Sequence, residues 1–404
     1  MTTEPVRPLW AGRTLALLGI VLVAFNLRTA VASLSPILGQ LEQEIPVSNA
    51  LAGLLGMLPP LCYAAFGIAT PVLARRFGLE PTLIVALVAL IAGLAGRGLA
   101  PSAWWLLGAS ALTFAAIGVG NVLLPPLVKR YFPDRVGLLT TVFVTAMSVS
   151  TFMPPLVAVP LADAAGWRAS LGVWAVVAVT ALVPWIALLV HPRRGVLAEL
   201  PEEAEPGMLR HALRSRLAWA LAIVFSVSGF NAYSLFAWLP AILEQTAGST
   251  PAQAGALLSL YAAMGLPAGI AVPVLAERHG RVRSLIAVGV VSIVLGYAGL
   301  IVAPAVATWL WVALAGVGPL LFPLALVLIN LRTRTHAGAV ALSGFVQSAG
   351  YLIVAVGPLA VGLLHEWTGG WTAPLWLLLA SAVPAAIAGV VVARPRFLED
   401  ERER

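Results

Sequence analysis

The sequence is poor in residues that soluble proteins use freely. Only 10% of its 404 residues are charged, against about 25% in a typical soluble domain. Its one cysteine, Cys62, excludes a disulfide within the chain and a metal site built on paired cysteines. No Walker loop and no His-Glu-x-x-His motif is present, so we expect no cofactor and no metal.

Acidic residues and histidines are missing from the middle of the long apolar segments. All 17 aspartates and glutamates and all five histidines fall in termini, in loops or near segment ends. We therefore expect no intramembrane proton relay built from these side chains. An enzyme within the membrane would need paired catalytic groups at this depth, and a membrane sensor or assembly partner normally adds a soluble domain. The sequence favours neither class.

Long apolar segments make up most of the chain. Sixty per cent of residues are hydrophobic and the mean hydropathy is +0.96. The runs reach the roughly 20 residues that a helix needs to cross a bilayer, and they lack the period of two of a transmembrane barrel. The first run resembles a signal peptide, but it is long and contains Arg28, so we expect an uncleaved span. We predict an all-α membrane protein with twelve spans, at 15–38, 50–74, 82–100, 104–128, 137–161, 170–190, 217–243, 252–275, 284–303, 307–330, 338–364 and 371–393.

The basic residues predict the orientation. All but three of the 24 lysines and arginines lie in termini or loops that twelve spans place on one side. The exceptions are Arg28, inside a span, and Arg97 and Arg168, which we expect in loops on the other side. By the positive-inside rule, both termini are cytoplasmic in a multi-pass protein of the cell membrane. The net charge of +7 thus reflects topology and indicates no nucleic-acid partner.

The chain divides into two similar halves. The longest polar stretch, 191–216, predicts a cytoplasmic linker, with room for a short amphipathic helix, between N-terminal (1–190) and C-terminal (217–404) six-helix bundles. Three pairs of segments correspond and keep their order: Phe25-Asn26 with Phe230-Asn231, Leu73–Gly78 with Leu275–Gly280, and Gly118–Gly120 with Gly316–Gly318. Collinear pairs of this kind indicate an internal repeat.

With these features the chain resembles the major facilitator superfamily over nearly its whole length. Glu277–Arg283 is similar to the superfamily's loop between the second and third helices of a half, whereas Arg75 takes the acidic position in the first half and puts a salt-bridge latch there in doubt. A narrower resemblance is to the cyanate/2-nitroimidazole transporter family. Its marks are Asn26–Ala30, with Thr29 where that family usually has proline, Lys129–Gly137 and Leu342–Tyr351. The resemblance implies a substrate site near the membrane midplane between pseudo-symmetric halves, and alternating access by rocking of the halves.

Arg28 is the leading candidate for that site. An arginine at the centre of a span costs about 2.5–3.5 kcal/mol on insertion scales, so it normally faces a bundle interior or a water-filled cavity. Since no carboxylate lies within the spans, we expect Arg28 to meet an anionic or acceptor-rich ligand, and a guanidinium suits planar acceptors such as carboxylates. The alternative is a structural role, in which Arg28 binds helix carbonyls or water.

Other polar and aromatic residues could complete the site. Polar candidates in corresponding positions of the two halves, together with further span residues, are Asn26, Asn121, Asn231, Tyr233, Gln347 and Tyr351. Candidate aromatic walls are Tyr63, Trp238 and Tyr261. Interhelical hydrogen bonds and core packing are the structural alternatives for these side chains. Candidate gating residues in the cytoplasmic loops are Arg75, Arg76, Lys129, Arg130, Arg135, Glu277, Arg278 and Arg281.

The sequence therefore predicts a secondary transporter, active or facilitative, for a small anion or a small polar organic molecule. The alternative within the same fold is an exporter of multiple drugs or hydrophobic compounds, since such proteins bind with aromatic and apolar walls. The expected partners are a small-molecule substrate, anionic by the argument from Arg28, and the lipid bilayer. We expect a monomer.

Overall fold

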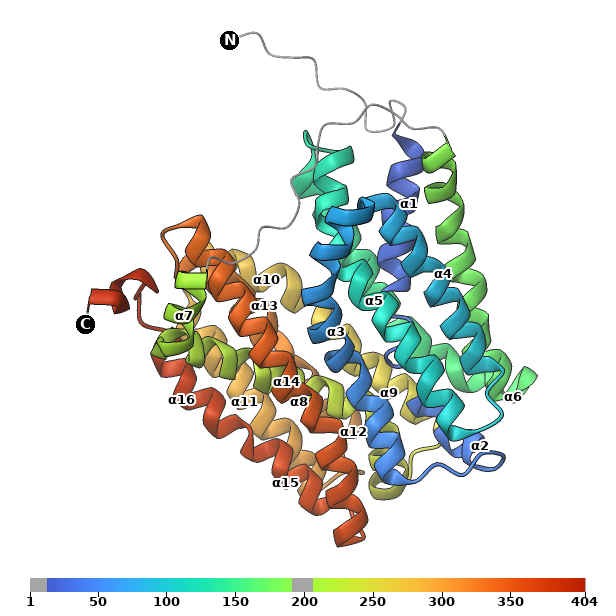
Figure 1. Ribbon diagram of the computed structural model, residues 1–404. Coiled ribbons are helices and arrows are strands. Elements are labelled where there is room, and N and C mark those ends of the chain that lie inside the picture. The colour runs from blue at the N-terminus through green and yellow to red at the C-terminus, as the bar shows by residue number, and fades with distance from the viewer. Residues whose placement is uncertain (1–12, 191–205, 404) are drawn as a thin grey trace.

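The computed structural model describes residues 13–190 and 206–403, and most of these residues lie in helices. Figure 1 shows two groups of helices side by side, the first half of the chain (13–190, blue to green) and the second half (206–403, green to red). Buried apolar side chains form a core cluster within each half. The chain therefore folds as two helical bundles joined through the segment between them.

The first half contains six passes of the chain. The first pass is α1 (Thr14–Asn26), a non-helical break, the short helix η1 (Ser35–Ile37) and α2 (Leu38–Glu42). The next three passes are α3 (Asn49–Phe77), α4 (Leu79–Gly98) and α5 (Ala103–Tyr131). The fifth and sixth passes form α6 (Val136–Val190), which is interrupted at Gly166, where φ is +83°.

The second half repeats this plan after the short helix α7 (Pro206–Arg214). Its passes are α8 (Arg216–Ala247), α9 (Pro251–Ala263) with α10 (Gly265–Glu277), α11 (Val282–Val302), α12 (Thr308–Val317) with η2 (Gly318–Leu320) and α13 (Leu321–Leu331), α14 (His336–Thr368), and α15 (Thr372–Ala380) with α16 (Ala382–Val392). A final turn, η3 (Glu399–Glu403), follows α16. Serine or threonine caps begin several of the long helices, as at Ser215, whose hydroxyl accepts the Ala218 amide.

The expected number of spans is confirmed. Within the described residues, ten helices are long and apolar enough to cross a membrane. One of them, residues 136–189, has 54 residues, about 80 Å at 1.5 Å per residue, so it provides two crossings on either side of Gly166. The twelfth is the first pass, whose helix α1 is short because it ends at Asn26. Expecting this pass as one continuous helix was therefore wrong.

Part of the predicted linker, residues 191–205, lies outside the described residues, as does the N-terminal segment before Arg13. The rest of the linker forms α7, the short helix that the polar stretch allowed for. His211 of α7 lies 2.8 Å from the carbonyl of Leu398, with its Nε2 facing the oxygen. The end of the linker is thus held against the C-terminal segment of the second half.

The two halves pack tightly at one end, where α3 begins and α14 ends. A Cβ added to Gly56 of α3 would lie 2.8 Å from the Cβ atoms of Ala237 in α8 and Pro358 in α14. A Cβ added to Gly255 of α9 would lie 2.7 Å from the carbonyl oxygen of Pro155 in α6. Small residues allow helix backbones this close in a membrane bundle. We call this region the closed end; in Figure 1 it lies at the lower side, away from the start of α1.

Candidate functional site

The first pass is broken at Arg28. The helix α1 ends at Asn26, with the Leu27 amide still bonded to the Val23 and Ala24 carbonyls, and helical structure resumes at Ser35. Two local hydroxyls take up carbonyls there: Thr29 Oγ1 donates to the Asn26 oxygen and Ser33 Oγ to the Ala30 oxygen, both at 3.3 Å. Irregular backbone at membrane depth is tolerated where protein or water surrounds it. The break presents Arg28 between the helices instead of along α1.

Arg28 lies among polar and aromatic groups of the first half. Its Nη1 donates to the Leu27 carbonyl at 3.2 Å and to Oδ1 of Asn121, in α5, at 3.4 Å. Its guanidinium carbon lies 5.6 Å from the ring centre of Tyr63, in α3, close enough for a cation–π interaction. Arg28 keeps partial exposure, whereas Tyr63 is buried. Among the described residues, no acidic side chain forms an ion pair with Arg28.

Tyrosines from the second half complete the surroundings of Arg28. The ring of Tyr63 meets Tyr233, in α8, edge-on at 6.4 Å and Tyr351, in α14, edge-on at 6.0 Å between centroids. Both tyrosines therefore lie against the ring that contacts the Arg28 guanidinium. We call Arg28, Tyr63, Asn121, Tyr233 and Tyr351 the central cluster. It combines one cation and several hydroxyl donors with flat apolar rings, and it takes groups from both halves.

Asn26 and Asn231 make matching contacts away from the central cluster. The Asn26 amide nitrogen donates to Leu22 at 2.8 Å and to Val177, in the sixth pass, at 3.5 Å. The Asn231 amide nitrogen donates to Val227 at 2.7 Å and to the Ser381 hydroxyl, at the junction of α15 and α16, at 2.8 Å. Each asparagine thus ties the first pass of its half to the last, in agreement with the internal repeat.

The hydrogen bonds and ring contacts of the remaining candidates, Gln347, Trp238 and Tyr261, are made with residues other than Arg28. Gln347 donates to Ser343 one turn earlier in α14, at 2.8 Å. Trp238 is buried, donates to the Pro358 carbonyl and packs against Trp371. Tyr261 is buried with its ring 5.6 Å from that of Phe236, which links it indirectly to Tyr233. For Trp238 the contacts are those of core packing at the closed end.

The candidate gating residues lie at the end of the molecule opposite the closed end. Five of them are exposed at the ends of α3 and α10 or just beyond: Arg75, Arg76, Glu277, Arg278 and Arg281. Lys129 is exposed and Arg135 half-buried at the α5–α6 turn, where Arg130 pairs with Glu80 of α4 at 3.1 Å. The Tyr131 hydroxyl donates to the same carboxylate at 2.9 Å. Glu80 therefore links α4 to the end of α5 within one half.

The same turn holds the start of α1. Arg13 donates to Asp134 at 2.6 Å and to the Tyr131 carbonyl at 3.1 Å. The Arg13 guanidinium holds the pKa of the Asp134 carboxyl below its usual value. The segment Lys129–Gly137, noted in the sequence as a family mark, thus organises the contacts of the first half at this end.

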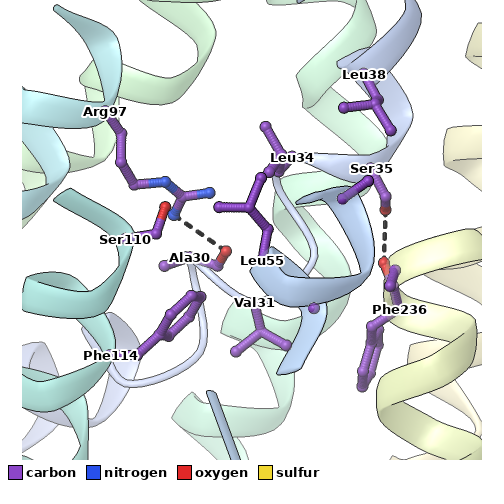
Figure 2. Close-up of a pocket in the computed structure, with 13 residues that line it drawn as sticks. Ala30, Val31, Leu34, Ser35, Leu38, Leu55, Arg97, Ser110, Phe114 and Phe236 are labelled. Carbon is purple, nitrogen blue, oxygen red and sulfur yellow. Dashed lines mark hydrogen bonds between the residues drawn. The ribbon is translucent and has the colours of Figure 1, made fainter. Parts of the chain in front are cut away.

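Arg97 corrects one expectation from the sequence. We expected it in a loop, but it lies in the last turn of α4 with 1% of its surface exposed. Its Nη1 donates to the Ala30 carbonyl, in the break of the first pass, at 3.2 Å (Figure 2). The glycines beside Arg97 could have indicated this burial, because glycine allows close helix packing. A Cβ on Gly98 would lie only 2.9 Å from the Cα of Gly172. Such close packing turns this part of α4 toward the protein. Arg168 is exposed and pairs with Glu44, but it lies in α6, two residues beyond the kink at Gly166, and not in the expected loop.

Comparison with known proteins agrees with this architecture. Residues 17–351 match the Major Facilitator Superfamily. The chain is 34% identical over 391 residues to the "Uncharacterized transporter YycB" of Bacillus subtilis (strain 168), covering 96% of this chain and 95% of that protein. It is 33% identical over 387 residues to the "2-nitroimidazole transporter" of Escherichia coli (strain K12), covering 95% and 96%. It is 28% identical over 357 residues to the "Cyanate transport protein CynX" of the same organism, covering 88% and 91%.

The fold is also that of a solved structure. A bacterial homologue of the human lysosomal transporter Spinster, in an inward-facing and occupied conformation, aligns with a TM-score of 0.73 and 16% sequence identity. The alignment covers 98% of this chain and 99% of that one. At this identity the likeness concerns the fold.

Proposed function

Because the chain belongs to the major facilitator superfamily, and within it to the group of the cyanate and 2-nitroimidazole transporters, we propose that this secondary transporter carries a small anion or a small polar organic molecule with several acceptor atoms. Binding takes place at the central cluster. Arg28 supplies the charge that recognises the substrate, Asn121 orients the guanidinium, and Tyr63, Tyr233 and Tyr351 enclose it.

The observation that carries this proposal is the state of Arg28. A guanidinium has five N–H donors. Among the described residues, Arg28 makes a ring contact with Tyr63 and two hydrogen bonds from one nitrogen, to a neutral carbonyl and a neutral amide. A charge at this depth is costly without a partner, and the described residues supply no carboxylate to it. A ligand with negative charge or several acceptor oxygens or nitrogens would stabilise it. The two relatives named for cyanate and 2-nitroimidazole transport fit this class of ligand.

The movement follows from the closed end. With both termini cytoplasmic, as the basic residues predict, the closed end faces the outside and the structure corresponds to an inward-facing state. Transport then requires the contacts of Gly56 with α8 and α14 to separate while the cytoplasmic ends of the halves approach each other. The central cluster, built from both halves, would change its geometry during that movement.

The aromatic rings favour a second candidate, an exporter of hydrophobic compounds. Tyr233, Phe236 and Tyr261 form a chain of edge-on contacts, and Phe225 meets Tyr351 at 5.1 Å. Such rings could bind an apolar or cationic drug, as in the alternative drawn from the sequence. The two candidates differ in what Arg28 does, because a cationic drug gains nothing from a guanidinium.

Purified protein separates the candidates through thermal stabilisation by cyanate, 2-nitroimidazole, small carboxylates and hydrophobic cations. We expect stabilisation by small anions or acceptor-rich molecules, and its loss in Arg28→Ala. Removing a charged partner costs about 2–5 kcal/mol, roughly 30- to several-thousand-fold in affinity. Arg28→Lys should rescue little, since lysine cannot present the planar fork. Arg214→Ala, an exposed arginine in α7, is the matched control. Stabilisation that survives in folded Arg28→Ala protein would contradict the proposal.

A further inference from the structure

A buried arginine, Arg97, faces a small cavity at the closed end. Arg97 of α4 and Ser110 of α5 reach this cavity, whose other walls include Leu34, Leu55, Gly56 and Phe236 (Figure 2). The space open to the centres of water molecules is about 30 Å³, room for about two waters. Arg28 and the four other members of the central cluster do not line it. The cavity is therefore a separate place in the molecule.

Both polar groups that face the cavity lack full hydrogen bonding. Within the described parts of the chain, Arg97 Nε and Ser110 Oγ have no hydrogen-bond partner, although each residue is only 1% exposed. Arg97 Nη1 donates a hydrogen bond to the neutral carbonyl of Ala30. A buried charge without a counter-charge is strongly unfavourable, and an unsatisfied buried hydroxyl also costs free energy. The two groups need a partner that accepts hydrogen bonds and carries negative charge.

The residues that line the cavity limit the size and the chemistry of this partner. None of the 13 lining residues is acidic, and most are apolar. Ser35, the third polar residue in the lining, already donates its hydroxyl proton to the Phe236 carbonyl at 2.6 Å. The free donors are thus one guanidinium and one hydroxyl, beside a cavity of about 30 Å³ that is only partly enclosed. We propose that this cavity binds a small monovalent inorganic anion of the size of chloride, held between Arg97 and Ser110.

The position of the cavity links this anion to the movement of the halves. Ala30, Gly56 and Arg97 belong to the first half, whereas Phe236 and Ala237 belong to α8 in the second half. The cavity is complete only while the two halves are packed at the closed end. A ligand that binds one conformation shifts the population toward it. The anion therefore stabilises the state that is closed at this end, in addition to any substrate at Arg28.

The first test compares sodium chloride with sodium gluconate at equal ionic strength, because gluconate is too large for the cavity. It uses purified full-length protein carrying Arg28→Ala, so that the central cluster cannot supply the signal. We expect chloride to raise the melting temperature in this background. Adding Ser110→Ala should weaken the chloride titration about tenfold, the value of one hydrogen bond to a charged partner. Ser148→Ala, whose hydroxyl bonds to a carbonyl of its own helix, is the control.

The second test locates the anion directly, by crystallising the protein in sodium bromide and measuring anomalous scattering. We expect a peak between the Arg97 guanidinium and Ser110 Oγ, and its loss in Ser110→Ala or Arg97→Lys crystals. No peak there, together with melting curves that are equal in chloride and gluconate, would overturn the proposal and leave water as the occupant. Neither result depends on whether Arg28 binds a substrate, so this site and the proposed function fail or succeed separately.

Discussion

A methyl group at Gly56 should push the two halves apart at the closed end. A Cβ at this position would lie 2.8 Å from the Cβ atoms of Ala237 and Pro358, both in the second half. A Cβ cannot rotate away from a clash, because it is fixed to the backbone. Gly56→Ala therefore cannot be accommodated without movement of α8 and α14 away from α3.

The clash of Gly56→Ala destabilises only the conformation in which the halves are packed at the closed end. Overpacking a tight contact typically costs about 1–3 kcal/mol, which shifts a conformational equilibrium by about 5- to 150-fold. The clash exists only while the halves are packed at the closed end, so the variant should populate the state that is open there. Transport that needs both states should slow correspondingly.

Distance measurements between spin labels test this reasoning. Gln43 and Glu366 are exposed near the closed end, in the first and second halves, and cysteines placed there can be labelled in a Cys62→Ser background. We expect longer distances in Gly56→Ala. Gly67→Ala is the matched control, since a Cβ on this glycine of the same helix would meet nothing within 4 Å. Unchanged distances in folded Gly56→Ala protein would refute the account of the closed end.

Three further predictions follow from the contacts. Asn231→Ala loses bonds to Val227 and Ser381 and should destabilise the protein by about 1 kcal/mol, seen as a lower melting temperature; an unchanged melting temperature would show that this tie contributes nothing. Arg13 lowers the pKa of Asp134, so the pair makes a small contribution to folding stability. This contribution is present above the unfolded pKa of about 3.9 and is lost as the pH falls below it. Wild type and Asp134→Asn should therefore differ in melting temperature at pH 6 and converge near pH 3. Reporter fusions should place both termini in the cytoplasm; a terminus outside would contradict the orientation.

The number of spans could be predicted because it depends on composition. Apolar length and the one-sided distribution of arginines are properties of the sequence alone, and they gave twelve passes. The break at Arg28 was harder to foresee, since residues 27–34 contain no proline or glycine and the helix stops through local hydrogen bonds of Thr29 and Ser33. The pattern of apolar residues does not show where side-chain hydroxyls replace backbone amides as hydrogen-bond donors to the carbonyls.

The sequence predicted which residues form the central cluster better than it predicted how they are arranged. Arg28, Tyr63 and Tyr351 stood out as polar or aromatic residues in spans, but which of them meet depends on how α3 and α14 pack across the halves. The same limit applies to Asn26 and Asn231, whose repeat position suggested the substrate site and whose contacts tie the first and last passes of each half. The burial of Arg97 was not predicted, because a side chain near the end of a span can point toward the protein or toward the surface. The close packing at Gly98 determines which of the two occurs.

Uptake by proteoliposomes tests the central claim most directly. Purified wild-type protein and Arg28→Ala would be reconstituted at equal density, and entry of labelled cyanate and 2-nitroimidazole would be compared with entry of a labelled hydrophobic cation. The account predicts uptake of at least one of the first two compounds, little uptake of the cation, and loss of the uptake in Arg28→Ala. Transport of the cation alone, or equal transport by both proteins, would contradict it.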